Sequence, residues 1–313
     1  MKTLEIKRVL VPIDFSEVSL NALESAIAIC KIQLSTLTLI HIVENNFMLF
    51  SQELSGLNGN ILSDLMKIAE DQLSKLAKKI RVKHDIVVNH IVQPGNPADE
   101  TCMFAVQKQS DLIVIATHGT SGFREFFLGS NAYRVVKNAP CPVLTIPGKS
   151  SWTEFRNILF PIRMVPNAFE KYDVVRPIIR RNNSSLLIAG FIQLKFPTGF
   201  VEMKEKVDHY KNIVLRDDVI CRSEVHTCDN VAKKVLSISE IERPDLIVIT
   251  ATLDEKLKDF FIGPYTQTIV NHAHFPVLSI RPEINRDLVS PTPVTSSAED
   301  GFNLYKPNIV AGV

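Results

Sequence analysis

The sequence has few features of a membrane protein, a nucleic-acid-binding protein or a metalloprotein. No apolar run reaches the roughly 18 residues of a membrane span, and the formal charges of the 313 residues nearly cancel, at +1. Such a balance gives no global field for nucleic acid or an anionic membrane. The first residues include an acid and lead directly into a predicted strand, so we expect no signal peptide. We expect a cytoplasmic, globular protein with neither of those partners.

Cysteine is also scarce. The five cysteines are scattered, and Cys221 and Cys228 have no His or Cys pair at zinc-binding spacing nearby. We therefore expect free, mostly buried thiols and no metal site. Neither a Walker lysine loop nor a kinase signature is present. We assign no catalytic residue, and whether the chain is an enzyme stays uncertain.

The chain does contain a long internal repeat. Residues 111–146 align with residues 245–280 without a gap. The identical pairs include Asp111/Asp245, Phe126/Phe260, Gly129/Gly263 and Pro142/Pro276. Upstream, segments 8–14 and 157–163 both contain Pro-Ile before a final charged residue. A repeat of roughly 140 residues is a domain and not a solenoid unit.

We expect two domains, residues 1–147 and 152–282, followed by an aperiodic tail at 283–313. In the first domain, strands are predicted at 8–13, 36–43, 85–92, 112–116 and 143–146. Helical spacing of apolar residues predicts helices at 16–32, 61–80, 98–108 and around 132–138. The strands are apolar throughout, as strands covered on both faces are. The predicted class is α/β, with two doubly wound parallel five-stranded sheets.

In the first domain, a buried strand runs directly into a glycine-bearing loop and then a helix start, over residues 111–130. Backbone N–H groups that no side chain obstructs can converge on phosphate oxygens, and the helix adds its positive end. Doubly wound sheets bind ligands beyond the carboxyl ends of their strands, where the strand order reverses. That edge carries Asp14, Val43 and loop 116–130, so the sequence predicts a phosphate-binding site there.

With these segments, the chain resembles the universal stress protein family over nearly its whole length, as a tandem two-domain member. The residues that carry the resemblance are Val11-Pro-Ile-Asp14, Gly95-Asn-Pro97, Asp111-Leu-Ile-Val-Ile115, His118-Gly-Thr-Ser-Gly122 and Ala139-Pro-Cys-Pro-Val-Leu144. The resemblance implies an adenine nucleotide α-hydrolase-like, Rossmann-like fold arranged as a pseudo-dimer. ATP-binding members carry a loop of Gly, two residues, Gly, nine residues, Gly, then Ser or Thr. Ala116, Gly119, Gly129 and Ser130 stand at those positions here, so alanine replaces the first glycine.

By resemblance, the first domain binds ATP, with or without Mg. Asp14 would bond the ribose or lie near the adenine, and Val43 would meet the adenine through its backbone. The full set of implied contact residues is Pro12, Ile13, Asp14, Val43, Ile115, Ala116, His118, Gly119, Gly129, Ser130 and Asn131. The alternatives are a helix N-terminal acid for Asp14, an N-cap for Ser130 and a turn residue for His118. Ala116 weighs against ATP, because it adds a methyl group and closes off positive φ.

The second domain has lost these residues. Arg163, Thr250, Leu253, Lys256 and Pro264 replace Asp14, Ala116, Gly119, Gly122 and Ser130. Proline removes an N–H, and Leu253 would stand where phosphate oxygens belong. The two cations could serve an anion, but we favour solvated surface charges. We expect a degenerate site.

Three functions remain open: an adenine-nucleotide-binding stress-response protein whose second domain is a structural or regulatory partner, an interaction scaffold that binds no nucleotide, and a slow ATPase. Domains of the family commonly dimerise through the last strand of the sheet, so the resemblance implies that the two domains pair within the chain through segments 143–146 and 277–280. Each segment is also an apolar edge that would be hazardous if left open. A homodimer and unknown protein partners stay open.

Overall fold

The computed structural model describes residues 5–44, 58–117, 129–148, 151–165, 167–194, 199–251, 253–254 and 261–281. Up to Pro282 the chain forms one compact unit. The predicted tail at 283–313 lies outside the described residues. The boundary between the two predicted domains stays a prediction, and we refer below to a first half and a second half.

The first half alternates strands and helices as expected. Its elements are β1 (Arg8–Pro12), α1 (Glu17–Gln33), β2 (Thr36–Glu44), α2 (Asn58–His84), β3 (Val88–Gly95), α3 (Pro97–Gln107), β4 (Leu112–Ala116), α4 (Ser130–Asn138) and β5 (Val143–Ile146). Among the strands, β3 differs most from the prediction, whereas β1 and β2 each differ by one residue at the end. β3 starts three residues later than Asp85, because α2 continues to His84 and Asp85 takes a left-handed turn with φ of 52°.

The second half repeats this order. Its elements are β6 (Asn157–Ile162), α5 (Lys171–Asn182), β7 (Ser185–Gln193), α6 (Phe200–Arg216), β8 (Cys221–Cys228), α7 (Val231–Glu242), β9 (Leu246–Thr250), β10 (Leu253–Asp254), β11 (Phe261–Ile262), α8 (Pro264–His272) and β12 (Val277–Ile280). β10 and β11 form a small antiparallel pair that has no described counterpart in the first half.

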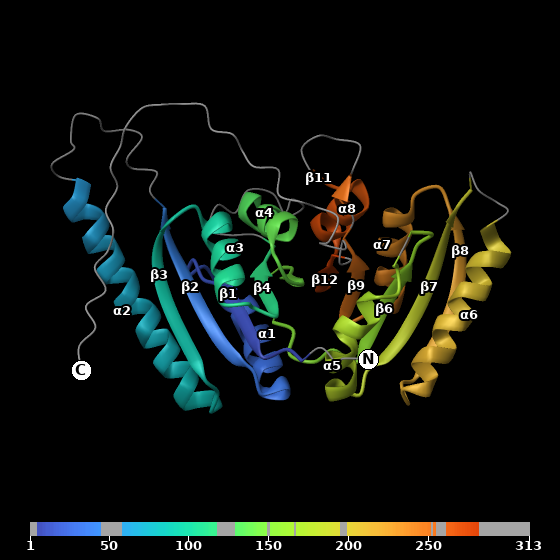
Figure 1. Cartoon of the computed structure of the whole chain (residues 1–313), viewed down its shortest axis with the longest axis horizontal. Coiled ribbons are helices and arrows are strands. Elements are labelled where there is room, and N and C mark those ends of the chain that lie inside the picture. Colours follow the sequence, from blue (N-terminus) through green and yellow to red (C-terminus); the bar gives the residue numbers. More distant parts are fainter. Residues whose placement is uncertain are drawn as a thin grey trace. The chain divides into compact units, whose positions relative to one another are not determined.

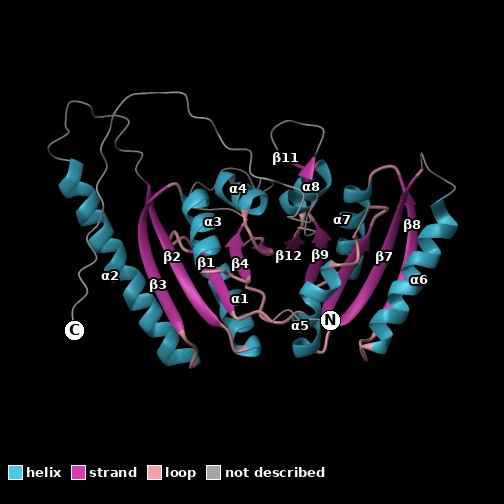
Figure 2. Ribbon diagram, in the orientation of Figure 1, coloured by secondary structure: helices cyan, strands magenta, loops and turns pink. Residues whose placement is uncertain are grey.

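The strands form one ten-stranded sheet, in the order β3-β2-β1-β4-β5-β12-β9-β6-β7-β8. Each half contributes five parallel strands, and the strand order reverses between β1 and β4 and again between β6 and β9. Helices cover both faces (Figure 1, Figure 2). β4 and β9 are buried at every residue, which explains their unbroken apolar sequences. The predicted fold class is confirmed.

The two halves meet where β5 pairs antiparallel with β12. Leu144 lies opposite Leu278 in this pairing, and each is 1% exposed. The Thr145 hydroxyl donates across the junction to the Val277 carbonyl, at 3.2 Å. The predicted pairing of the last strands is therefore present, and the two five-stranded sheets become one.

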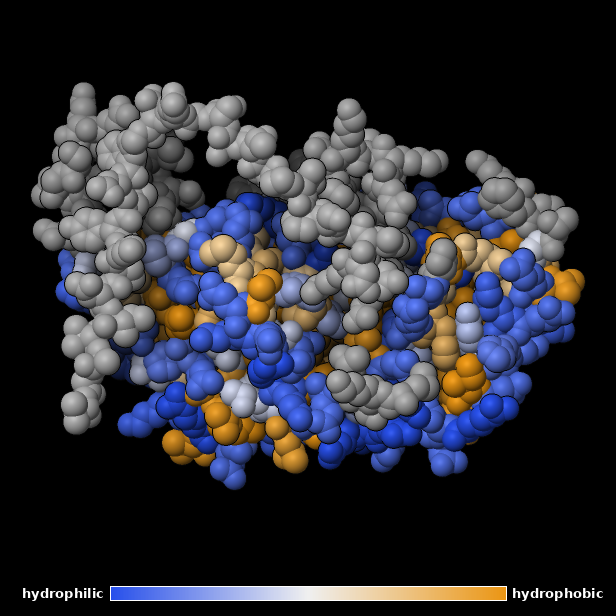
Figure 3. All heavy atoms as spheres, viewed as in Figure 1, coloured by the Kyte–Doolittle hydropathy of each residue, from blue (hydrophilic) through white to orange (hydrophobic). Residues whose placement is uncertain are grey.

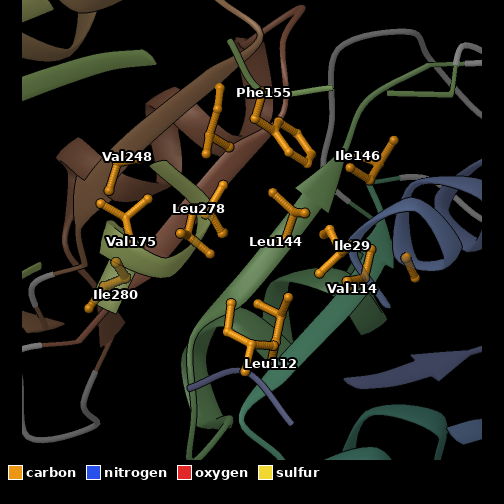
Figure 4. Packing of buried hydrophobic residues seen from close by; sticks show 14 of the residues in the cluster. Ile29, Leu112, Val114, Leu144, Ile146, Phe155, Val175, Val248, Leu278 and Ile280 are labelled. Carbon is orange, nitrogen blue, oxygen red and sulfur yellow. The ribbon is translucent and has the colours of Figure 1, made fainter. Parts of the chain in front are cut away.

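The cores on the two faces of the sheet differ in how far they extend. On one face, side chains from α1, α2, α5 and α6 join strand residues of both halves in a single cluster. Figure 4 shows its centre, where Leu144 and Leu278 lie between residues of both halves. On the other face, α3 and α4 cover one cluster and α7 and α8 cover a second. The face bearing α1 and α5 therefore ties the halves together.

One hydrogen-bond arrangement, present once in each half, holds the amino ends of the central strands. The Asp111 carboxylate accepts from the backbone N–H groups of Lys7 and Arg8, and the Asp245 carboxylate accepts in the same way from residues 156 and 157. Each carboxylate thus ties the start of a central strand to its neighbour. This role accounts for the identity of the two aspartates in the repeat.

The outer surface is mixed. On the face that Figure 3 shows, hydrophilic side chains predominate over the described residues, and apolar ones appear singly or in small groups. Isolated apolar residues on a surface are ordinary. In the described part of the chain, no helix is long and apolar enough to cross a membrane.

Candidate functional site

The carboxyl edge of the first half is built on the crossover between β1 and β4. After Pro12 ends β1, the Ile13 N–H still donates to the Ile40 carbonyl of β2, at 2.8 Å. The Ile13 side chain is buried, whereas Asp14 is exposed at the edge. Val43 is 8% exposed near the end of β2. The sequence-predicted residues of β1 and β2 therefore do lie at one edge.

The Asp14 carboxylate takes part in starting α1. Its Oδ1 accepts from the Ser16 backbone N–H at 3.0 Å and from the Ser16 hydroxyl at 2.6 Å. Ser16 in turn caps the helix by accepting from the Ser19 N–H, at 3.2 Å. Asp14 thus acts on the helix through Ser16, close to the helix-start alternative raised from the sequence. The ribose-binding role stays a prediction.

Two residues at this edge were missed by the sequence analysis. Phe15 adopts a left-handed backbone with φ of 61°, which is uncommon for a bulky residue and is found at binding sites and tight turns. Its ring packs against the His41 ring, with centroids 4.9 Å apart. His41 Nδ1 lies 2.6 Å from the Ile13 carbonyl oxygen. The available signal was a histidine inside an otherwise apolar segment of β2.

The end of β4 brings the second group of predicted residues to the same edge. Ile115 and Ala116 are each 8% exposed. The Gly129 N–H donates to the Thr117 carbonyl at 2.7 Å, so the two ends of the intervening loop are held together. His118 and Gly119 lie outside the described residues.

Gly129 is the N-cap of α4, and no side chain caps the helix. The suggestion that Ser130 is the N-cap is wrong, because Ser130 already lies in the first helical turn. The first turn, which includes Asn131, contains no acidic residue. Backbone N–H groups in a first turn have no partner within the helix, and together with the helix dipole they favour an anion. This end of α4 therefore fits a phosphate group.

Ala116 has an ordinary strand conformation. It is paired with Ile146 of β5, and it is not among the residues with positive φ. Alanine therefore fits the backbone at this position. That its methyl group and the loss of positive φ weigh against ATP stays a prediction.

The equivalent edge of the second half has different chemistry. Arg163 follows β6 where Asp14 follows β1, and its Nη2 donates to the Thr250 carbonyl at 3.2 Å. The Arg163 guanidinium carbon lies 3.8 Å from the centroid of the Tyr265 ring. The expectation of a solvated charge at Arg163 is therefore wrong, because the side chain is half-buried and stacked. Lys256 lies outside the described residues, and no side chain is described for Leu253.

α8 begins as α4 does, with a glycine cap, Gly263, that has no side-chain hydrogen bond. Its first helical residue, however, is Pro264, which has no N–H to offer an anion. Burial lowers the pKa of Arg163 from its ordinary value. The second edge thus has a fixed cation and a weaker backbone cradle than the first.

The cysteines are free thiols. Burial raises the pKa of Cys30 and Cys141 to about 12 and that of Cys102 to about 11, which makes the reactive thiolates scarce near neutral pH. Over the described ranges, no group of three His, Cys, Asp or Glu side chains is placed to hold a metal ion.

The universal stress protein family model matches residues 5–147. A universal stress protein of Methanocaldococcus jannaschii is 36% identical over 141 residues, which are 45% of this chain and 81% of the relative. One of Bacillus subtilis is 30% identical over 150 residues, 44% of this chain and 97% of the relative. The chain belongs to the universal stress protein family.

A solved universal stress protein of Archaeoglobus fulgidus extends the likeness to both halves. It aligns with a TM-score of 0.71 over 89% of this chain and 99% of its own length, at 17% identity. A protein of unknown function from Pseudomonas aeruginosa aligns with a TM-score of 0.63 over 88% of this chain and 93% of its own length, at 15% identity. At these identities the likeness shows the fold alone, and it extends over both halves of the chain.

Proposed function

We propose that the chain is a stress-response protein that binds one adenine nucleotide, ATP, at the carboxyl edge of the first half. The observation that carries the proposal is the start of α4. Its glycine cap and acid-free first turn lie at the crossover of a doubly wound sheet, in the family whose ATP-binding members place phosphates there.

The surrounding residues suit the rest of a nucleotide. Asp14, exposed at the end of β1, offers a carboxylate for ribose hydroxyl groups. The apolar end of β2, with Val43, offers a surface and a backbone for the adenine. A bound Mg²⁺ would be held mainly by phosphate oxygens and water, as is usual for this ion.

The second half supports the first without binding ATP. Its edge strand β12 pairs with β5, whose backbone N–H and C=O groups would otherwise be unpaired at an edge with apolar side chains. Its own carboxyl edge has Pro264 at the first position of α8 and a cation in place of Asp14. We therefore assign one ATP to each chain.

Equilibrium binding of ATP to purified chain, with and without Mg²⁺, tests this proposal. Gly129→Leu is expected to abolish binding, because its side chain would enter the space that phosphate oxygens occupy. Gly263→Leu is the matched control and is expected to leave ATP binding intact. Circular dichroism must show both variants folded. Two nucleotides bound per chain, or equal binding by both variants, would refute the assignment.

The scaffold alternative rests on Ala116. If its methyl group has ended nucleotide binding, ATP will bind neither the natural chain nor Gly129→Leu, while Ala116→Gly will bind ATP. If the first proposal holds, Ala116→Gly will only strengthen the binding that the natural chain already shows. Release of inorganic phosphate from bound ATP, measured in the same samples, tests the slow ATPase alternative.

A further inference from the structure

The ten-stranded sheet ends on β3 in the first half and on β8 in the second (Figure 1). A strand at the end of a sheet has one row of backbone groups without a neighbouring strand, and such a row can pair with another chain. Charged residues on the strand discourage this pairing. β8 contains Arg222 and Glu224, whereas β3 contains no Lys, Arg, Asp or Glu. The free edge of β3 is therefore the less protected of the two.

Alternate residues of β3 direct their backbone groups to this free edge. A backbone N–H of β2 donates to the Val87 carbonyl, just before β3 begins. In a parallel ladder every second residue bonds to the same neighbour, so the odd-numbered residues of β3 face β2. The residues that face the free edge are Val88, His90, Val92 and Pro94. They form the row that a further strand would meet.

The two ends of this row complement each other. The Val88 carbonyl already accepts from Arg81 Nε of α2, at 2.7 Å. Pro94 has no backbone N–H. If β3 pairs antiparallel with β3 of a second copy about a twofold axis at Ile91, Val88 of each copy lies opposite Pro94 of the other. The acceptor that is already in use then meets the residue that has no donor, and the Val88 N–H donates to the Pro94 carbonyl of the second copy.

The middle of the row pairs fully in the same register. His90 of each copy lies opposite Val92 of the other, because these two positions are equally far from Ile91. Residues that face each other in this way exchange two hydrogen bonds in an antiparallel ladder. The register about Ile91 therefore leaves none of the four outward-facing residues with an unpaired backbone N–H.

Beside the free edge, α2 and β3 border an open hollow of about 740 Å³. Its wall includes the half-buried apolar side chains of Leu62, Met66 and Val92. A twofold axis perpendicular to the sheet keeps both copies of α2 on the same face of the extended sheet. The α2 helix of the second copy would therefore lie along this hollow and cover its apolar residues, which removes apolar surface from water.

The charges of the hollow are self-complementary about the same axis. Glu70 Oε1 lies 2.9 Å from His90 Nε2, so Glu70 is close to the level of Ile91. Lys67, which also lines the hollow, precedes Glu70 by about one turn of α2. Because the two copies of α2 would run in opposite directions, Lys67 of each copy would face Glu70 of the other. Opposite charges attract, and this pattern favours a second copy as the occupant of the edge.

We propose that two copies of the chain associate through the free edges of β3, antiparallel about Ile91, with their α2 helices side by side. The sheet then continues from one copy into the other. This surface is separate from the junction of β5 with β12. It does not depend on the nucleotide site proposed for the first half.

Sedimentation equilibrium of the full chain, from about 1 to 500 µM, tests this proposal. The average mass should rise with concentration from 35.1 kDa toward twice that value. Val92→Pro should weaken the dimer by about tenfold or more, because it removes an N–H that faces the second copy. Within one chain that N–H faces outward, and proline is tolerated at such positions of edge strands.

Val225→Pro is the matched control, because Val225 occupies on β8 the position that Val92 occupies on β3. It should dimerise as the natural chain does. Circular dichroism must show both variants folded. If the two proline variants lose the dimer equally, or if neither loses it, the contact does not lie on the edge of β3 and the proposal is overturned.

A charge exchange tests the surface without proline. Lys67→Glu should weaken the dimer, because it places two carboxylates opposite each other. The double variant Lys67→Glu/Glu70→Lys should restore it, since the exchanged charges are complementary again. A double variant that dimerises no better than Lys67→Glu would contradict the proposed arrangement. A mass that stays at one chain over the whole concentration range would leave the edge to a different partner and would overturn the proposal.

Discussion

Leu144→Ala is expected to lower the free energy of unfolding by about 2–5 kcal/mol, the usual range for Leu→Ala substitutions in a protein core. Leu144 is 1% exposed and lies opposite Leu278 in the central strand pair. Strands flank it on both sides, so the site has little freedom to collapse around the lost atoms. We expect a value in the upper part of that range.

The effect should reach both halves, because Leu144 and Leu278 belong to one cluster that extends from α1 to α6. Leu278→Ala should therefore cost a similar free energy. The double variant should depart from additivity by about 0.5–3 kcal/mol, as contacting residues do. Met103→Ala is the control, since Met103 is 50% exposed on α3, and it should change stability by less than about 0.5 kcal/mol.

Urea unfolding provides the assay, followed by circular dichroism and by the fluorescence of Trp152, the one tryptophan of the sequence. Trp152 reports on the junction, because its backbone N–H donates to the Ser25 hydroxyl of α1 and its ring packs edge-on against Phe275. Both signals should give one transition that moves together in each variant. Two separate transitions, with Leu144→Ala shifting one and Leu278→Ala the other, would refute the shared core.

Two further predictions concern the edges and the thiols. Separately expressed halves, residues 1–147 and 152–282, should self-associate or aggregate, because each exposes an apolar edge strand; sedimentation showing two stable, non-interacting monomers would contradict this. Cys30 has its pKa raised by burial to about 12 from 9.0, so the folded state keeps a proton that the unfolded state loses above pH 9. Stability should therefore fall between those values by about 1.4 kcal/mol per pH unit, and Cys30→Ala should remove that part of the slope in urea titrations at pH 8 to 10.

The sequence predicted the elements best where burial is complete. The strand predicted at 112–116 has the same limits as β4 in the structure. Its sequence is an unbroken apolar run, which is typical of a strand covered on both faces. β3 was placed three residues early because its sequence is only partly apolar. The hydrophobic pattern there could not show where α2 ends, and the left-handed turn at Asp85 decides that point.

The candidate site was predicted less completely, because it depends on contacts between distant segments. Asp14 and Gly129 could be placed at one edge from the sequence, because the strands were predicted to be parallel and the carboxyl ends of parallel strands share an edge; the strand order itself comes from the structure. The stacking of Phe15 on His41 and of Arg163 on Tyr265 does not follow from any local pattern. Each joins residues from separate elements, and only the packed fold brings them together.

Comparison of the two halves distinguishes the residues that pair the halves from the residues at the carboxyl edge. The shared aspartate of each central strand ties that strand to its neighbour, and the shared Val-Leu of the last strands forms the junction. The positions that differ, such as Arg163 and Pro264, lie at the carboxyl edge, away from those contacts. Pairing the halves therefore needs none of the ligand-binding residues. The carboxyl edge of the second half can therefore carry different side chains from the first without loss of the junction.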